Sequence, residues 1–171
     1  MKSPILLVDG YNMIASWKAT APFFKGQQLD QAREKLLSAL HDYAHFSHIP
    51  IICVFDAQFV PGSRQHYDQY GVDVVFTQED ETADAYIEHL ALELNDGPYI
   101  VSVATSDLNE QWGVFAKGAL RVSARELEER VGQNQKSLSH FVDKNDLAKP
   151  PLRPWDDQQL ADLKGLMEDL T

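Results

Sequence analysis

The stretch Leu6-Leu7-Val8-Asp9-Gly10-Tyr11-Asn12 decides the fold of this chain. Apolar residues run without interruption from Ile5 to Val8, which is typical of a strand buried on both faces of a parallel sheet. Asp9 and Gly10 follow as turn residues. Because open α/β sheets bind ligands at the carboxyl ends of their strands, the pattern places a carboxylate at the predicted binding edge.

Three further strands are predicted, and each leads to acidic residues. The strands span residues 51–55, 72–76 and 99–104, and the acidic residues that follow them are Asp56, Glu81, Asp84 and Asp107. If the strands are parallel neighbours, these side chains share one edge of the sheet with Asp9. Carboxylates this crowded repel one another unless a cation or shared protons offset their charge. We therefore predict a divalent metal site at this edge.

Helical patterns between the strands complete an α/β alternation. Helices are predicted over residues 29–47, 82–95 and 106–115, and a capping box at residues 123–126 opens another. Residues 120–122 form a short fifth strand. Residues 16–28 and 57–71 lack clear periodicity, so we predict loops there, the second beside the binding edge. The alternation predicts a doubly wound α/β layer with right-handed crossovers and leaves the strand order open.

The length and apolar content predict one domain. The 171 residues, 44% of them apolar, can build a full core, and we place this domain at residues 1–147. Residues 148–171 read as a proline-rich linker and a helix, which we expect to dock on the same domain. No apolar run is long enough for a signal peptide or a membrane span, and the single Cys53 favours a reducing compartment. We therefore expect a cytoplasmic protein without membrane contact.

The charge of the chain is negative and unevenly distributed. A net charge of −11 argues against loose electrostatic binding to nucleic acid. Between Gln65 and Ala116 there is no Lys or Arg, whereas eleven Asp and Glu fall in this acidic window. Basic segments flank it, as suits a metal site with a polyanionic substrate, although solvated surface charge gives the same pattern. Arg64 and His66 lie at its border and either hold a phosphate or belong to an ordinary surface loop.

Several other classes fit the sequence poorly. No glycine-rich phosphate loop, nucleophile elbow or Walker lysine occurs, which disfavours nucleotide kinases and serine hydrolases. A phosphatase of the haloacid-dehalogenase type needs a second aspartate where Tyr11 stands, and a receiver domain needs a lysine that is missing after Val103. His41, His45 and His48 share one helix face, but nothing completes a zinc site, so exposed histidines are favoured.

A set of short motifs covers most of residues 4–131. They are Val8-Asp9-Gly10-Tyr11-Asn12, Phe55-Asp56-Ala57, Phe76-Thr77, Glu81-Thr82-Ala83-Asp84, Ala104-Thr105-Ser106-Asp107 with Glu110-Gln111, Gly118-Ala119-Leu120-Arg121-Val122-Ser123 and Arg125-Glu126-Leu127. In this order they strongly resemble the YacP-like branch of the NYN domain family, which is related to PIN and FLAP nucleases. The resemblance implies a PIN-like three-layer α/β/α fold with a central, mostly parallel sheet.

The resemblance also implies an activity and a site. It implies an endoribonuclease that depends on Mg²⁺ or Mn²⁺, and a branch of the family is ribosome-associated and cuts mRNA in the ribosomal A site. By motif match, the catalytic metal carboxylates are Asp9, Asp84 and Asp107, the further acidic positions are Glu81 and Asp56, and the polar supports are Asn12 and Ser106. Apart from the motifs, we expect the basic residues that could contact RNA or a ribosome to be Arg64, His66, Arg121 and Arg125. Two alternatives stay open: a PIN-like module that binds RNA or protein without cleaving, and a hydrolase of small phosphate esters.

Overall fold

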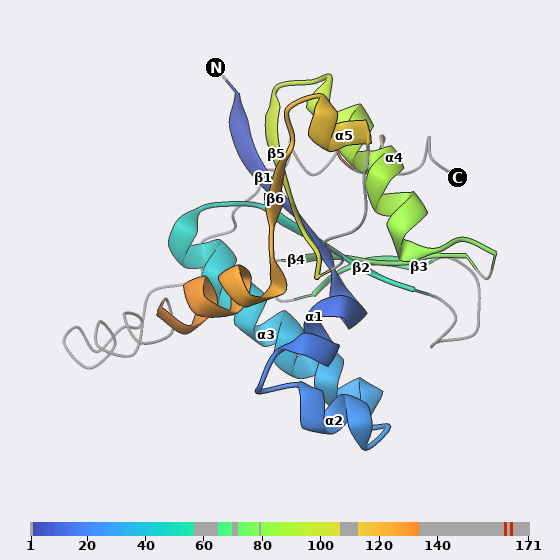
Figure 1. Ribbon diagram of the computed structural model, residues 1–171, viewed down its shortest axis with the longest axis vertical. Helices are drawn as coiled ribbons and strands as arrows, with labels where there is room; N and C mark the ends of the chain where they lie inside the picture. The colour runs from blue at the N-terminus through green and yellow to red at the C-terminus, as the bar shows by residue number, and fades with distance from the viewer. Residues whose placement is uncertain are drawn as a thin grey trace.

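A twisted six-stranded sheet forms the centre of the molecule (Figure 1). The computed structural model describes residues 2–56, 65–69 (backbone alone), 72–78, 80–106, 113–133, 163 and 165. The strands are β1 (Ser3–Asp9), β2 (Ile51–Phe55), β3 (Gln65–Gln69), β4 (Val72–Phe76), β5 (Tyr99–Ala104) and β6 (Leu120–Val122). They lie in the order β3-β4-β2-β1-β5-β6, and only β3 pairs antiparallel with its neighbour. The predicted, mostly parallel sheet is confirmed.

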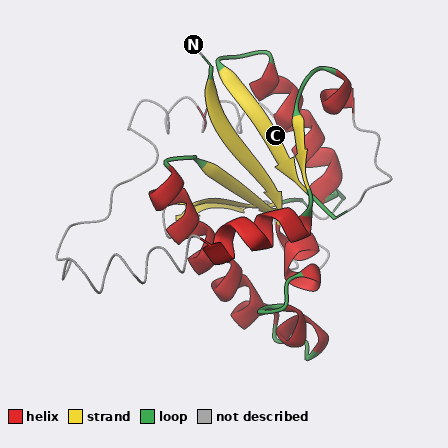
Figure 2. Cartoon of the chain, turned by 60° about the vertical axis from the view of Figure 1, so that its left-hand side comes forward, coloured by secondary structure: helices red, strands yellow, loops and turns green. Residues whose placement is uncertain are grey.

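Helices cover both faces of the sheet (Figure 2). They are α1 (Gly10–Ser16), α2 (Ala21–Lys25), α3 (Leu29–Ser47), α4 (Ala83–Asn95) and α5 (Gly113–Ala116), and a further helix spans residues 124–133. The helices α1 and α3 and the helix over 124–133 pack on one face, and α4 and α5 pack on the other. This arrangement confirms the predicted three-layer α/β/α fold.

The apolar run at the start of the chain is buried on both sides, as its composition predicts. Leu6 and Val8 pack in the core on the α3 side of β1, whereas Ile5 and Leu7 pack on the α4 side. Each is at most 4% exposed. Because both faces are filled, β1 is the central strand that fixes the position of Asp9.

The sheet has a topological switch point at β1. From β1 the chain builds β2 and β4 on one side, and it then returns to build β5 and β6 on the other. The connections that follow β1 and β5 therefore lead away from each other. A crevice outside the carboxyl ends of two such strands is where open α/β sheets bind ligands.

The prediction of a loop over residues 16–28 is wrong in part, because the short helix α2 lies within this segment and α1 extends to its first residue. β1 runs straight into α1, and α2 follows after one turn (Figure 1). The turn is tied down by Trp17, whose Nε1 donates to the carbonyl of Ala124 at 2.9 Å, and by Thr20, whose hydroxyl donates to the carbonyl of Ile14 at 2.7 Å. Helices this short show no periodicity, and these contacts stabilise them.

The prediction of an unbroken loop over residues 57–71 is also wrong, because β3 lies within it. Its backbone pairs antiparallel with β4 at the edge of the sheet, a position that accepts polar residues. The remaining predicted elements agree where they are described. The predicted helix over 106–115 is described only in α5, since residues 107–112 lie outside the described part of the chain.

Little of the C-terminal segment is described. Leu163 is helical and fully buried in the core on the α4 side, and most of the helix predicted there lies outside the described residues. The division at residue 147 stays a prediction. None of the helices in the described part of the chain has the length and apolar character needed to span a bilayer.

Candidate active site

Asp9 is a carboxylate forced into the core at the end of the central strand. It is only 6% exposed. The pKa of Asp9 is raised from 3.8 to about 8, chiefly by burial, then by repulsion from the Asp84 carboxylate and a hydrogen bond with it, with a smaller repulsion from Asp56. The backbone N–H of Asn12 lowers this pKa, but the Asp9 side chain makes no full helix-cap hydrogen bond. Asp9 and Asp84 are therefore neighbours, and their negative charges repel each other when both are ionised.

Asp84 reaches this position because the start of α4 is fixed at two points. Thr82 is the N-cap residue, and its hydroxyl accepts a hydrogen bond from the Ala85 N–H at 3.1 Å. The Asp56 carboxylate, at the end of β2, accepts a hydrogen bond from the Ala83 N–H at 3.3 Å. One strand end thus anchors the first turn of the helix that carries Asp84. Asp56 has a structural contact here besides its predicted place among the acidic residues.

A side-chain bridge crosses the switch point. The Asn12 Oδ1 accepts a hydrogen bond from the Ser106 backbone N–H at 2.6 Å and another from the Ser106 hydroxyl. Asn12 lies in α1 just after β1, and Ser106 follows β5, so the bridge links the two connections that diverge from the sheet. These two residues, predicted as polar supports, hold the ends of neighbouring strands together.

An aromatic wall packs behind the carboxylates. The ring of Phe55 lies 5.0 Å from that of Tyr11 and 5.3 Å from that of Phe76, centroid to centroid. A Cβ atom on Gly10 would lie 2.3 Å from the fully buried Phe55 ring, so only glycine fits where β1 turns into α1. The motif glycine is therefore required by close packing, although its φ is ordinary.

Sequence reasoning missed Arg33, which braces this wall. The Arg33 Nη1 donates to the Tyr11 hydroxyl at 2.9 Å, its Nη2 bonds to Asp30, and its guanidinium lies 5.8 Å from the centroid of the Phe76 ring. Its side chain is only 16% exposed. The signal in the sequence is its spacing, because Arg33 precedes Leu36 and Leu37 by one helical turn and so falls on the face that apolar periodicity assigns to the core.

The other predicted residues fall in different places. Glu81 closes a turn before α4, where its Oε1 accepts from the Gln78 N–H at 3.4 Å. The Arg121 guanidinium lies 4.5 Å from the centroid of the Phe115 ring. Arg125 is exposed and pairs with Glu129 at 3.3 Å. Asp107, Arg64 and the side chain of His66 lie outside the described residues.

The described carboxylates fit a hard divalent cation as a pair. Within the part of the chain that the structure describes, no three His, Cys, Asp or Glu side chains are grouped to hold a metal ion, the helical histidines included. Mg²⁺, however, is commonly bound by one or two carboxylates together with waters and substrate phosphates. Asp9 and Asp84 could supply two such oxygen ligands, and a cation between them would offset the repulsion that contributes to the raised pKa of Asp9.

Comparisons with known proteins agree with this architecture. A family model described as "YacP-like NYN domain" matches residues 6–168. The chain is 42% identical over 146 residues to YacP of Bacillus subtilis (strain 168), a match that spans 85% of each chain. A crystal structure of Rae1 (YacP) from Bacillus subtilis matches with a TM-score of 0.72 at 38% identity, covering 97% of this chain and 89% of that chain. A mutant of the same protein matches with a TM-score of 0.71 at 36% identity, covering 94% of this chain and 98% of that chain.

Proposed function

The chain belongs to the YacP-like NYN domain family, and from this membership and the paired carboxylates we propose that it is a divalent-metal-dependent endoribonuclease. The observation that carries the proposal is Asp9. A buried carboxyl group beside a second carboxylate costs folding free energy unless a cation or a shared proton offsets the repulsion, so a bound cation would account for this pair. Titratable groups perturbed in this way gather at active sites.

In this proposal, the residues of the site have two separate roles, metal binding and positioning. Asp9 and Asp84 would hold Mg²⁺ or Mn²⁺, with Asp107 as the third ligand that the motif match implies. When bound, such an ion supplies an activated water and offsets the charge that builds up on a phosphodiester. Asn12 and Ser106 keep the ends of β1 and β5 together, so that carboxylates from different strands stay in register.

We propose RNA as the substrate, and mRNA on the ribosome as its physiological form. The resemblance implies this substrate, and the charge of the chain is consistent with delivery by a partner. A protein with a net charge of −11 gains little from free electrostatic attraction to RNA, so docking on a ribosome would supply the positioning.

The proposal is tested by cleavage of a reporter mRNA in a translation extract, with and without translation, mapped at its 5′ ends. Asp84→Asn removes one charge from the pair and should abolish cleavage without loosening the fold. Asp96→Asn is the matched control, since this exposed residue caps the opposite end of α4 and should leave cleavage unchanged.

Each other outcome rejects a named part of the proposal. Cleavage that survives Asp84→Asn would place the chemistry elsewhere. A folded wild-type protein that cuts no RNA in either condition would instead support a binding module. Turnover of a chromogenic phosphate ester without any RNA cut would indicate a hydrolase of small molecules, and cleavage that does not depend on translation would remove the ribosome from the proposal.

A further inference from the structure

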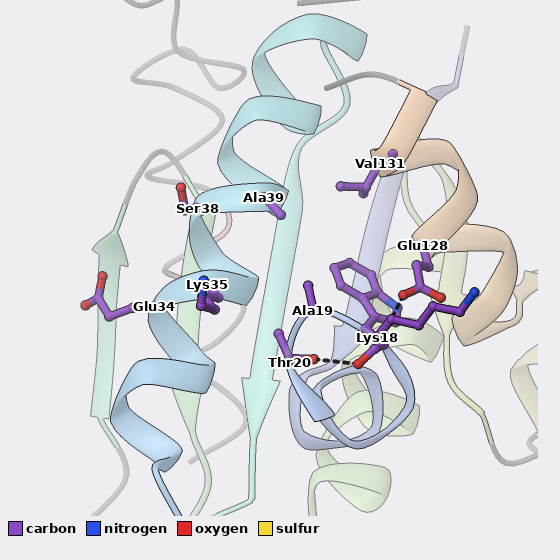
Figure 3. A pocket seen from close by; sticks show the side chains of 11 residues that line it. Lys18, Ala19, Thr20, Glu34, Lys35, Ser38, Ala39, Glu128 and Val131 are labelled. Carbon is purple, nitrogen blue, oxygen red and sulfur yellow. Dashed lines mark hydrogen bonds between the residues drawn. The ribbon is translucent and has the colours of Figure 1, made fainter. Parts of the chain in front are cut away.

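Two adjoining clefts lead away from the switch point on the α3 side of the sheet. The cleft nearer the site has a volume of about 560 Å³ and is lined by Ser106, Ser16 and Arg125. The farther cleft, of about 610 Å³, lies between α3 and the helix over 124–133. Lys18 and Glu128 line both clefts, so the two clefts adjoin at these residues, and we refer to the pair as the groove. Figure 3 shows the farther cleft, with Lys18 beside Glu128 and Lys35 across from them on α3.

The groove carries three cationic and three acidic side chains, so it is formally neutral in a protein whose net charge is −11. Lys18, Lys35 and Arg125 line it, and they come from three separate segments of the chain. Lys18 and Lys35 are exposed, and the side chain of Arg125 is 87% exposed. The three positive charges therefore lie where a soluble polyanion can reach them.

Intramolecular contacts partly offset the acidic side chains of the groove. The Glu128 Oε2 accepts a hydrogen bond from the Lys18 backbone N–H at 2.7 Å, and Glu129 pairs with Arg125 at 3.3 Å. Glu34 also lines the farther cleft, although its side chain projects away from the other labelled side chains (Figure 3). The Lys18 ammonium itself is not used in the Glu128 contact, since the backbone makes that hydrogen bond.

We propose that this groove holds the single-stranded RNA on one side of the bond that is cut, with Lys18 and Arg125 binding its phosphates next to the site and Lys35 binding farther out. The inference rests on the proposed endoribonuclease function. One end of the groove contains Ser106, which is bonded to Asn12 at the switch point, so a strand lying in the groove reaches the carboxylate edge. Hydroxyl groups and spaced cations along a groove bind a backbone without reading its sequence.

A binding measurement tests the groove separately from catalysis. The Asp84→Asn protein serves as the parent, because it should hold RNA without cutting it. Binding of a fluorescent single-stranded RNA oligonucleotide is measured by anisotropy at several salt concentrations. Adding Lys18→Gln and Arg125→Gln should lower the affinity roughly tenfold and make the slope of log K against log salt shallower by about 0.7 for each lost phosphate contact.

The matched control is Lys2→Gln. Lys2 is exposed and stands at the amino end of β1, at the edge of the sheet opposite the groove, and its substitution removes one positive charge, as does each of the two groove substitutions. Equal affinity and equal salt slope in the groove variant and the control would overturn the inference, and so would the absence of RNA binding by the parent. A small anionic metabolite that competes with RNA only in the groove would identify a different occupant and overturn it as well.

Kinetic measurements distinguish an error in the groove inference from an error in the proposed nuclease activity. In the protein with Asp84 intact, Lys18→Gln should raise KM about threefold or more and leave kcat nearly unchanged, because binding is lost equally from the ground and transition states. RNA binding that depends on the groove residues, without any cleavage, would support the groove and contradict the proposed nuclease activity. Cleavage whose KM and kcat are unchanged by Lys18→Gln and Arg125→Gln would support the nuclease activity and contradict the role of the groove.

Discussion

Replacing Asp9 with asparagine should stabilise the metal-free protein while it abolishes cleavage. The folded protein holds the pKa of Asp9 at about 8, against an ordinary value of 3.8, through burial and the neighbouring Asp84. A raised pKa means that the folded state binds the proton more tightly than the unfolded state. The favourable contribution of protonated Asp9 is therefore complete below pH 4 and is lost as the pH rises to about 8.

The size of the effect follows from the distance between the two pKa values. Between the unfolded pKa of 3.8 and pH 7, about three pH units, the Asp9 carboxyl is ionised in the unfolded state and protonated in the folded state. At about 1.4 kcal/mol per pH unit, the folded state loses about 4 kcal/mol of stability over this interval. The asparagine that replaces Asp9 cannot ionise, but its amide is still buried and keeps some desolvation cost. We expect Asp9→Asn to gain about 2 kcal/mol at pH 7, or roughly 4 to 8 °C in Tm for a domain of this size.

The assay is thermal unfolding in chelator across pH 4 to 8, with and without added Mg²⁺ or Mn²⁺. The wild-type protein should lose stability over this range in chelator, and the Asp9→Asn variant should lose less. A divalent cation should raise the Tm of the wild type because it binds only the folded state, and it should leave the variant unchanged. An Asp9→Asn protein that is less stable than the wild type in chelator would refute the reasoning, since the carboxylate would then be structural.

Three further predictions concern the groups around the carboxylates. Gly10→Ala should lower the free energy of unfolding by about 1 to 3 kcal/mol in denaturant titration, because its Cβ overlaps the Phe55 ring. Asn12→Ala removes the bridge across the switch point and should lower kcat on the order of 10- to 100-fold with little change in Tm. Trp17→Phe removes the hydrogen bond that ties the turn after α1 to the helix over 124–133 and should cost about 1 to 3 kcal/mol, with faster hydrogen exchange in that helix. A neutral Gly10→Ala, an Asn12→Ala protein with full kcat, or unaltered exchange in Trp17→Phe would each contradict the contact it tests.

The fold could be predicted because its strands carry a strong and simple signal. Residues 5–8 and 51–55 are apolar runs, and residues 72–76 are apolar except for Asp73; only a sheet covered on both faces can bury such runs, and the structure buries all of them. The order of the strands could not be predicted, because parallel strands joined by helices show no pairing pattern in their sequence. The edge strand β3 was missed as well, since a strand at the edge of a sheet needs no apolar alternation.

The site could be predicted in part, because chain position determines where an aspartate goes. Asp9 follows the central strand directly, and Asp84 follows an N-cap threonine, so both are placed by local rules. Arg33 was missed because it lies in α3, far from the motifs, and its contact with the Tyr11 hydroxyl depends on how two helices cross. Its spacing from Leu36 and Leu37 indicates a side chain that faces the core, but no local pattern in the sequence identifies the partner that it contacts there.

The fold places charged residues from different parts of the chain at two separate locations. The acidic window between residues 65 and 116 contributes Asp84 to the carboxylate pair, whereas Lys18, Lys35 and Arg125 come from segments on either side of it and meet in the groove. Two neighbouring carboxylates thus form the proposed metal site, and three cations line the groove in which a phosphate backbone is proposed to lie. Since the two sets lie on different elements, removal of a groove cation should change KM and removal of a site carboxylate should change kcat. A groove variant whose main effect is on kcat would mean that the charge separation inferred from the fold does not govern how RNA is used.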